Sequence, residues 1–245
     1  YDEQGLEEYL SYFRISSNAV YPFSEHGKRC FLRLAPVQEK QEENLRGELA
    51  FLEYLHKEGY PSMKPVLAKT GSLLVMIHTE WGTYYASVFE GVAGKPVEDT
   101  DYNKEIMFSY GKTLGWLHRL SMEYKPACKK WSYQEVLEWI KSVCMQYDAP
   151  NFMLKEATLV EEQLASLERN KETYGLVHYD FEPDNVFYDE EDGKCRVIDF
   201  EDGMYHFFLV DIEQVFDVLS EELEGEVLQQ AKIHCLEGYQ SEKCL

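Results

Sequence analysis

Residues 175–202 carry polar side chains that could exchange protons or bind a metal ion. His178 and Asp180 stand close together, Asn185 follows five positions after Asp180, and Asp199 comes directly after an apolar run. Carboxylate and amide oxygens suit Mg²⁺, which takes the rest of its coordination shell from water and phosphates. A neighbouring aspartate could accept a proton from a hydroxyl group. The pattern therefore indicates chemistry on a metal-bound phosphate.

The residues between Asn185 and Asp199 predict a β-hairpin that brings the two ends of this stretch together. Two short apolar strands are separated by a turn of acidic residues and glycine. In an antiparallel pairing, Val186 would lie opposite Ile198, and Asn185 and Asp199 would then lie about 5 Å apart at the open end. Asp180, in the loop before the hairpin, would face the same point.

A simpler interpretation is an acidic hairpin whose polar side chains only bind the backbone groups of their own turns. A histidine and an aspartate alone would favour it. The complete set, with an apolar strand that leads into Asp199, favours a functional site instead. It matches phosphoryl transfer, in which one aspartate accepts a hydroxyl proton and an asparagine and a second aspartate hold the metal.

Two segments in this stretch carry a resemblance to a known family. HYDFEPDN (178–185) and VIDFEDG (197–203) resemble the catalytic and metal-binding segments of the aminoglycoside phosphotransferase/choline kinase-like family. The branch with type II homoserine kinases and bacterial stress-response kinases is the most similar. The resemblance implies an α+β, two-lobed protein-kinase-like fold, with an antiparallel sheet and one main helix in the N-lobe and a mostly helical C-lobe that carries the hairpin.

The resemblance also implies ATP and Mg²⁺ as cofactors, and it gives roles to the matching residues. Asp180 would accept the proton of the substrate hydroxyl, while Asn185 and Asp199 would hold Mg²⁺ between the β- and γ-phosphates. His178 would orient the loop by hydrogen bonding rather than exchange protons.

A second part of the site is expected far upstream. The alternation in the predicted strand 28–34 places Arg33 beside Phe31, and the leucine spacing of the predicted helix 42–57 brings Glu48 onto its buried flank. A buried carboxylate needs a cation, and Arg33 is the candidate. The resembled family has a lysine there that contacts nucleotide phosphates. Arg33, oriented by Glu48, would bind the α- and β-phosphates in its place, although the exchange of lysine for arginine is not conservative. The alternative is an exposed ion pair of little value.

The bend at residues 16–18 lies where the family has the loop that covers the nucleotide phosphates. The bend contains no glycine. Short polar residues at the end of a strand also form ordinary turns, so Ser17 and Asn18 are candidates for phosphate binding with a simple turn as the alternative.

Residues 89–96 form a glycine-rich connector that ends in proline, and the composition changes there from strands to helices. We therefore expect a nucleotide-binding lobe over residues 1–88, a hinge over 89–96 and a catalytic and substrate-binding lobe over 97–245. In the resembled family the backbone of this hinge binds the adenine edge, which would fall to Phe89, Glu90, Gly91 and Val92.

Three further acidic residues flank the predicted site. Glu182, Glu201 and Asp202 are candidates for substrate binding, and Glu201 could bind a second metal ion or a substrate ammonium group. The alternative is that they are solvated turn charges.

The remaining helical patterns have mainly structural interpretations. Amphipathic helices are predicted over residues 1–13, 132–147 and 153–169. The Trp and Tyr residues of the last two helices, all of them within 132–147, could form a pocket for a cationic group or belong to the core. We expect His118 to be a structural histidine. Asp211 should cap the following helix, and in the resembled family an aspartate here braces the catalytic loop.

The composition limits the possible partners. The chain has 245 residues and a formal net charge of −21, which argues against nucleic acid and favours a cationic substrate. Six cysteines without a C-x-x-C pair read as reduced thiols, and no apolar run is long enough for a membrane span, so a cytoplasmic location is expected. The first residue is Tyr, and family members usually continue with more helices, so we expect a longer natural chain.

These observations predict an ATP-dependent phosphotransferase that acts on a hydroxyl group of a small, amine-bearing molecule. A Ser/Thr protein kinase of the stress-response type is the alternative. A nucleotide-binding pseudokinase is a third interpretation, which Arg33 and the glycine-free bend leave open.

Overall fold

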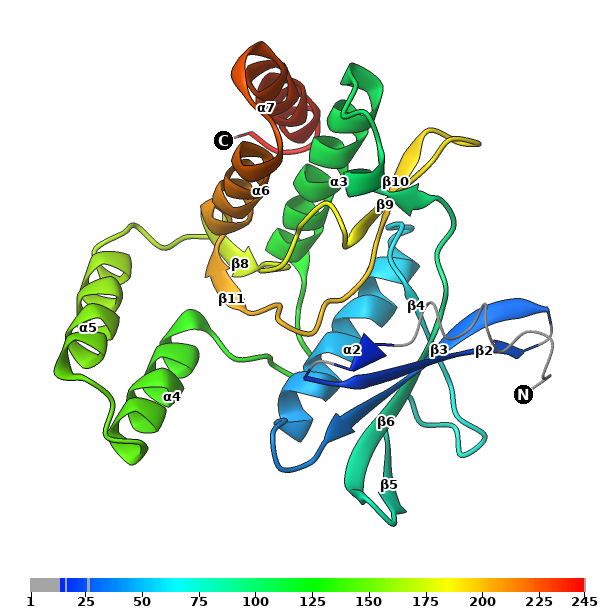
Figure 1. Cartoon of the computed structure of the whole chain (residues 1–245), viewed down its shortest axis with the longest axis vertical. Helices are drawn as coiled ribbons and strands as arrows, with labels where there is room; N and C mark the ends of the chain where they lie inside the picture. The colour runs from blue at the N-terminus through cyan, green and yellow to red at the C-terminus, as the bar shows by residue number, and fades with distance from the viewer. Residues whose placement is uncertain (1–13, 16, 26, 245) are drawn as a thin grey trace.

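The computed structural model describes residues 14–15, 17–25 and 27–244, so the helix predicted over residues 1–13 lies outside the described part of the chain. Figure 1 shows two lobes: a twisted sheet with one long helix, and a larger lobe made mostly of helices. The predicted α+β, two-lobed architecture is confirmed.

The N-terminal lobe is built on an antiparallel sheet of six strands within the described residues. The strand order is β1-β2-β3-β6-β4, and β5 pairs with β6. Arg33 and Ala35 lie two residues apart on β3 and are both buried, as the alternation of a strand requires. The strands are β1 (Arg14–Ile15), β2 (Ala19–Glu25), β3 (Lys28–Pro36), β4 (Lys64–Val66), β5 (Val75–Thr79) and β6 (Gly82–Glu90).

Helix α2 (Glu42–Lys57) buries one side along its whole length. Its leucines at the predicted helical spacing belong to the main hydrophobic core, which spans both lobes. Glu48 lies on the same side and is completely buried. The helix therefore carries a carboxylate into the core, where only a cationic partner can make it stable. The four leucines are Leu45, Leu49, Leu52 and Leu55.

The connector between the lobes folds back onto the C-terminal lobe. Its strand β7 (Lys95–Pro96) pairs with β9 (Val186–Asp189), and the short helix η2 (Val97–Asp99) follows. Gly94 has a φ of +98°, and a Cβ added there would lie 2.5 Å from the carbonyl oxygen of Tyr188. Only glycine permits both the left-handed backbone and this close approach.

The C-terminal lobe surrounds helix α3 (Lys104–Glu123), which contacts α7 (Gly225–Gln240) and the strands of this lobe. Strand β9 forms a hairpin with β10, and β8 pairs with β11. The remaining elements that place the site are β8 (Tyr174–Leu176), β10 (Lys194–Val197), β11 (Tyr205–Phe207) and α6 (Leu209–Glu222).

Helices α3 and α7 pack backbone against backbone. A Cβ added at Gly111 would lie 1.8 Å from the carbonyl oxygen of Cys235, and one added at Gly238 would lie 2.0 Å from that of Phe108. Neither position can hold a larger residue unless the two helices separate. These glycines fix the distance between α7 and the helix that carries His118.

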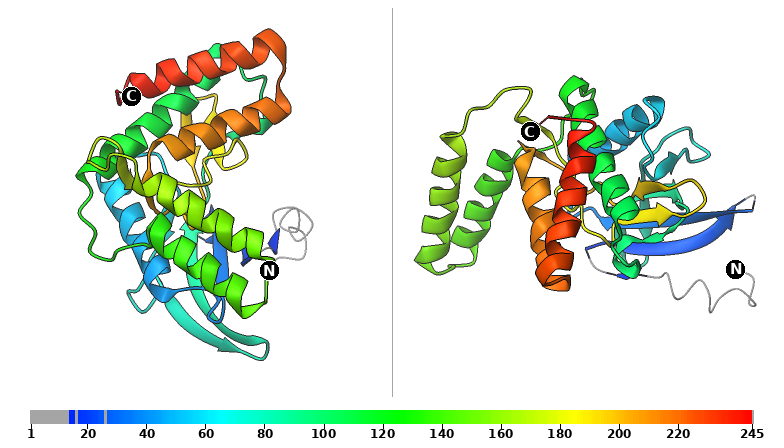
Figure 2. Two further views of the ribbon diagram at one scale, coloured as in Figure 1. Left: turned by 90° about the vertical axis from the view of Figure 1, so that its left-hand side faces the viewer. Right: turned by 90° about the horizontal axis from the view of Figure 1, so that it is seen from above.

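Helices α4 (Tyr133–Gln146) and α5 (Asn151–Ala165) form a helical hairpin that stands to one side of the C-terminal lobe (Figure 2). Ser132 and Glu135 form a capping box at the start of α4. Trp139 and Tyr147 are exposed, so the interpretation of the aromatic residues as core is wrong for these two, whereas Tyr133 is buried. No helix in the described part of the chain is long and apolar enough to cross a membrane.

Candidate active site

The hairpin of β9 and β10 is present, but its register differs from the prediction by one residue. Val186 pairs with Val197 rather than with Ile198, and the Ile198 amide donates to the Asn185 carbonyl at 3.0 Å. The apolar run was too uniform to set the register by itself. Asp199 therefore lies beyond the paired strands, with a φ of +57° that non-glycine residues rarely adopt.

The hairpin is fixed to the N-terminal lobe directly before Asp199. The Met63 amide donates to the Val197 carbonyl at 2.7 Å, and the Val197 amide donates to the Pro61 carbonyl at 2.9 Å. The chain then turns sharply at Asp199, whose side chain is exposed. This tie to residues 61–63 of the other lobe sets where the carboxylate can lie.

Asp180 and Asn185 are brought together as predicted. The Asn185 side-chain amide donates to the carboxylate of Asp180 at 2.8 Å and to its carbonyl at 3.1 Å. Because Nδ2 is used in this way, Oδ1 of Asn185 is directed elsewhere and remains available as a ligand. Among the described residues, no protein group donates to it.

The carboxylates of the site repel one another. Burial raises the pKa of Asp180 to about 7, and the neighbouring charges of Glu182, Asp199 and Asp202 add to the effect. Desolvation by the surrounding protein also raises the pKa of Asp199 to about 6, although this residue reaches solvent, and Arg33 opposes the shift. Since Asp199 is exposed, water screens part of this repulsion. The site carries negative charge that the described residues do not neutralise, and a cation would relieve it.

This donor set fits a metal that is shared with a substrate. No cluster of three or more histidine, cysteine or acidic side chains in the described residues could enclose a metal ion alone. Asn185 and Asp199 would supply two oxygens and leave the other positions to water and phosphate, as Mg²⁺ prefers. The residues present therefore fit a nucleotide-bound divalent cation better than a permanent metal centre.

Asp211, which is completely buried, holds the loop that carries His178 and Asp180. Its carboxylate accepts hydrogen bonds from the amides of His178 at 2.9 Å and Tyr179 at 2.8 Å. Its third partner is Nε2 of His118, at 2.9 Å. Burial alone would raise the pKa of Asp211, but the hydrogen bonds and charges of His118 and His178 together outweigh it and the pKa is lowered. The predicted brace is confirmed.

Two other predictions about this region are resolved. Asp211 does not cap the following helix, because α6 begins at Leu209 and Asp211 lies inside its first turn. His118 is a structural histidine, as predicted, with its Nδ1 2.9 Å from the hydroxyl of Tyr239. Burial lowers the pKa of His118.

His178 connects the two halves of the motif. Its Nε2 lies 2.9 Å from the Ile198 carbonyl, so Nε2 carries the proton and donates. Burial lowers the pKa of His178 to about 4, and the ring is neutral near pH 7. A neutral ring fixed in this way agrees with a role in orienting the loop.

Arg33 and Glu48 form a buried, two-pronged ion pair. Nη1 and Nη2 of Arg33 donate to the two carboxylate oxygens of Glu48 at 2.9 and 2.6 Å. The guanidinium also lies 4.9 Å from the centre of the Phe89 ring. Both partners are buried, so the alternative of an exposed ion pair is wrong.

Glu201 lies beneath the N-terminal lobe and is not a solvated turn charge. Its carboxylate is 3.2 Å from Nη1 of Arg33, accepts from Nδ2 of Asn18 at 2.5 Å and contacts Nζ of Lys40. These protein groups occupy the carboxylate that we had considered for a second metal ion or a substrate ammonium group. Asp202, in contrast, is exposed.

Of the two described residues in the bend before β2, one contacts the site. Asn18 contacts Glu201, whereas Ser17 is exposed and Ser16 lies outside the described residues. Glu182 stays in the catalytic loop, close enough to Asp180 to raise its pKa.

Of the four hinge residues, two belong to β6 and one has its amide already in use. Phe89 and Glu90 pair with β3, and the Gly91 amide donates to the Arg29 carbonyl at 2.9 Å. Its N–H is therefore not free for an adenine edge. Among the predicted residues, Val92 is the first one beyond this pairing.

Lys40 and Lys130 contact the site and were not predicted. Nζ of Lys130 is buried and donates to the carbonyls of Phe200, at 3.0 Å, and Glu201. Burial lowers the pKa of Lys130 to about 8. Gly47 of α2 makes room for it, since an added Cβ would lie 2.7 Å from Cγ of Lys130. A lysine in a loop gives no pattern from which such a role could be predicted.

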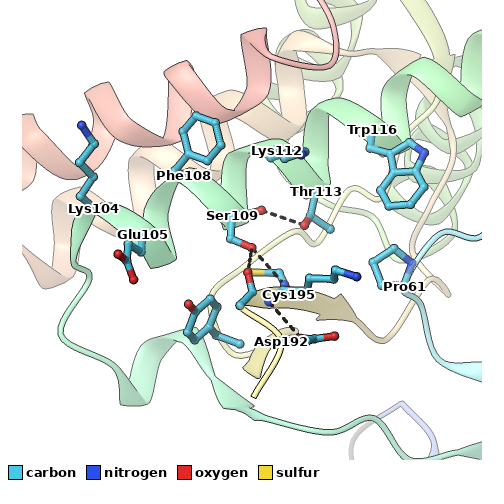
Figure 3. A pocket seen from close by; sticks show the side chains of 13 residues that line it. Pro61, Lys104, Glu105, Phe108, Ser109, Lys112, Thr113, Trp116, Asp192 and Cys195 are labelled. Atoms are coloured by element: carbon cyan, nitrogen blue, oxygen red, sulfur yellow. Dashed lines mark hydrogen bonds between the residues drawn. The ribbon is translucent and has the colours of Figure 1, made fainter. Parts of the chain in front are cut away.

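A cavity of about 660 Å³ lies elsewhere, between α3 and the turn of the β9–β10 hairpin (Figure 3). None of the residues predicted for the site lines it. The hydroxyl of Ser109 in its wall is already engaged, because it donates to the Gly193 carbonyl and accepts from the Cys195 amide. This cavity is separate from the candidate active site.

Comparisons with known proteins agree with the fold. The chain is 27% identical over 206 residues to an amicoumacin kinase from Bacillus subtilis (strain 168), which covers 80% of this chain but 59% of that protein. The chain thus spans about three fifths of that curated relative. Among solved structures, an amicoumacin kinase in complex with AMP-PNP, Ca²⁺ and Ami matches with a TM-score of 0.79 and 24% identity, over 100% of this chain and 79% of that one.

A microcompartment-associated aminopropanol kinase matches with a TM-score of 0.70 and 17% identity, over 95% of this chain and 75% of that one. The model of a family described as phosphotransferase enzymes (APH) matches residues 14–243, which is nearly the whole chain. The chain therefore belongs to the phosphotransferase enzyme family.

Proposed function

We propose that this protein transfers the γ-phosphoryl group of ATP to a hydroxyl group of a small, amine-bearing molecule. The observation that supports this most strongly is the contact between Asn185 and Asp180, beside a carboxylate charge that the described residues do not neutralise. This arrangement is suited to phosphoryl transfer, where positioning and charge stabilisation account for most of the catalysis.

Asp180 is the proposed base. Asn185 holds one of its carboxylate oxygens, Oδ2, so the other remains for the hydroxyl group of the acceptor. With a pKa raised to about 7, the carboxylate is a better proton acceptor than an ordinary aspartate. The raised pKa and the fixed orientation favour proton removal as the hydroxyl oxygen bonds to phosphorus.

Asn185 and Asp199 are the proposed ligands of a divalent cation, with Mg²⁺ as the physiological ion. When bound, the cation would neutralise charge on the β- and γ-phosphates. The bound AMP-PNP and Ca²⁺ of the similar amicoumacin kinase support a nucleotide and a divalent ion here. His178 and Asp211 position the loop and do not take part in proton transfer.

The N-terminal lobe is the proposed nucleotide-binding part, over residues 1–88, with the hinge at 89–96 and the catalytic lobe at 97–245. Arg33 and Glu48 fix α2 against the sheet on the side that would face the nucleotide phosphates, and Asn18 lies over that side. The backbone of the hinge, beyond the engaged amide of Gly91, would bind the adenine edge.

The acceptor is proposed to be a cationic amino alcohol or a related amine. The chain has a net charge of −21, and Glu182 and Asp202 add negative charge next to Asp180. The name of the similar aminopropanol kinase points to the same class of acceptor. A neutral or anionic alcohol would gain nothing from this field.

The proposal is tested by measuring Mg²⁺-dependent ADP formation with a panel of amino alcohols, larger amines and hydroxyl-bearing peptides. We expect turnover with an amine-bearing acceptor, a loss of roughly 10²- to 10⁴-fold in Asp180→Asn, and little change in Asp184→Asn, which removes the same charge from an exposed position in the loop. Turnover that survives in Asp180→Asn would rule out the assigned base. Wild-type activity on peptides alone would indicate a protein kinase.

A further inference from the structure

Arg33 has little access to a nucleotide, because its side chain is almost fully enclosed. Nη1 donates to Glu48 and lies 3.2 Å from Glu201, and Nη2 donates to the second oxygen of Glu48. Nε is buried without an acceptor among the described residues, and the guanidinium lies over the ring of Phe89. The Arg33 side chain is only 6% exposed. The surrounding protein therefore encloses almost the whole guanidinium.

Releasing Arg33 towards a phosphate would leave Glu48 charged, completely buried and without its partner. Removing one member of a buried ion pair is strongly unfavourable, because the remaining charge has neither water nor a counter-ion. Arg33 is therefore suited to holding β3 against α2. Contact with the phosphates needs another cation on the same side of the site.

Lys40 meets this requirement. Its backbone amide donates to the Pro36 carbonyl at 3.1 Å, which holds the residue at the end of β3, directly before α2. Its Nζ contacts the carboxylate of Glu201, and its side chain is 18% exposed, more than that of Arg33. A lysine carries a compact charge on a flexible stem, so its Nζ can move between neighbouring anions at little cost.

Glu201 lies directly beneath the bend that we expect to cover the phosphates. Nδ2 of Asn18, in that bend, is 2.5 Å from the carboxylate oxygen that also faces Arg33. Oδ1 of Asn18 is buried and has no donor among the described residues. Lys40, Glu201 and Asn18 thus form one cluster between the bend and the segment that begins with Asp199.

We propose that Lys40 is the phosphate-contacting cation of this chain, and that Glu201 holds it ready until the nucleotide arrives. The inference rests on the proposed function, since it assumes a nucleotide phosphate at this place. A phosphate oxygen is a strong acceptor that competes with the carboxylate for Nζ. The two tasks of the family's strand lysine are then divided: Arg33 pairs with the helix glutamate and Lys40 binds phosphate.

The test compares direct binding of ATP, ADP and adenosine by calorimetry, in the presence of Mg²⁺, for the wild type and two variants. Lys40→Met removes the charge and keeps most of the side-chain length. Lys57→Met is the matched control, because it removes an exposed lysine from the other end of α2. We expect Lys40→Met to weaken ATP binding roughly 10- to 100-fold and to leave adenosine binding unchanged. The control should match the wild type.

Two results would overturn the inference: ATP binding by Lys40→Met that equals the wild type, or an equal loss for ATP and adenosine, which would indicate general damage. Arg33→Met provides the contrast. It should lower the unfolding temperature markedly, because it leaves Glu48 unpaired, whereas Lys40→Met should leave it nearly unchanged. The converse pattern of stability would also count against the inference.

Failure of the proposed function would look different. In that case the wild type itself would neither bind ATP with Mg²⁺ nor release ADP, whatever residue stands at position 40. A wild type that binds and turns over ATP, with a Lys40→Met variant that binds ATP equally well, would refute only the assignment of Lys40.

Discussion

Nε2 of His178 donates to the carbonyl oxygen of Ile198 at 2.9 Å, and this bond joins the catalytic loop to the residue before Asp199. The loop and the metal-binding segment lie on separate stretches of chain. The neutral imidazole of His178 sets the position of one relative to the other. The backbone amide of the same residue donates a hydrogen bond to Asp211. The bond requires a proton on Nε2 but no charge on the ring.

The protein should become less stable as the pH falls, because His178 titrates. Its pKa is lowered to about 4 in the folded protein, against about 6.5 in an unfolded chain. The unfolded chain binds the extra proton first, so the contribution is complete above pH 6.5 and is lost as the pH falls towards 4. The maximum effect is about 3 kcal/mol. Urea unfolding at pH 7.5 and 5.0 should show about 2 kcal/mol of this loss, since pH 5.0 lies above the pKa of the folded protein.

The matched variant is His178→Gln, whose amide can still donate to Ile198 but cannot titrate. Asp180 and Asp199 have raised pKa values and act in the opposite direction, since protonation relieves their repulsion. They are present in both proteins, so the difference between wild type and variant isolates the histidine. An equal loss of stability in both on acidification would contradict the prediction.

Replacing Asp199 should stabilise the free protein and remove its response to the metal. Asp199→Asn removes a charge whose desolvation by the surrounding protein, together with repulsion from the neighbouring carboxylates, raises the pKa of Asp199 to about 6. After discounting for its exposure to water, we expect a gain of roughly 1 kcal/mol at pH 8 without divalent ions. Mg²⁺ with ATP should raise the unfolding temperature of the wild type and not of this variant.

Glu191→Gln is the control for that measurement, because it removes a carboxylate from the exposed hairpin turn. It should behave like the wild type in both conditions. A metal-dependent shift that persists in Asp199→Asn would mean that Asp199 is not a ligand.

Removing Asp211 should unfold the catalytic loop. Asp211→Ala leaves the amides of His178 and Tyr179 and Nε2 of His118 without their buried acceptor. We expect a loss of about 3 kcal/mol or more in the free energy of unfolding. Asp217→Ala, on the exposed side of the same helix, should cost less than about 0.5 kcal/mol. Chemical denaturation of both variants decides the matter, and similar values for the two would refute the brace.

Lys130 should matter for stability as well as for the site. Lys130→Met keeps the apolar stem but leaves the Glu201 carbonyl without a donor and leaves the Phe200 carbonyl with only the 3.3 Å bond from the Gly203 amide. We expect a loss of roughly 2 kcal/mol in the free energy of unfolding and a weaker response to Mg²⁺ with ATP. Lys129→Met is the control, since that side chain is 61% exposed. Equal stabilities of the two variants would show that Lys130 does not hold the segment.

The motif between His178 and Asp202 predicted much of the site, because each of its residue types has a specific chemical use. Arg33 and Glu48 could also be paired, since alternation and helical spacing place both on buried faces. The register of the hairpin could not be predicted, because Val197 and Ile198 are equally apolar and the tie to residues 61–63 is a tertiary contact.

Lys40 and Lys130 escaped prediction for a different reason. Both lie in irregular segments, where no periodicity shows which way a side chain points. Their partners are far away in the sequence: Glu201 reaches Lys40 through the packing of the two lobes, and Phe200 reaches Lys130 through packing within the C-terminal lobe. The N-cap predicted at Asp211 is wrong because α6 starts at Leu209, three residues before the start that the apolar pattern indicated.

The close packing of α3 against α7 at Gly111 and Gly238 has a consequence for synthesis on the ribosome. It seats Tyr239 against His118, which holds Asp211, which in turn holds the loop of Asp180. Tyr239 follows Asp202 in the chain, so the emerging chain completes all the acidic residues of the site before it completes their support. A nascent chain that has not released α7 would carry every proposed catalytic group and still be inactive.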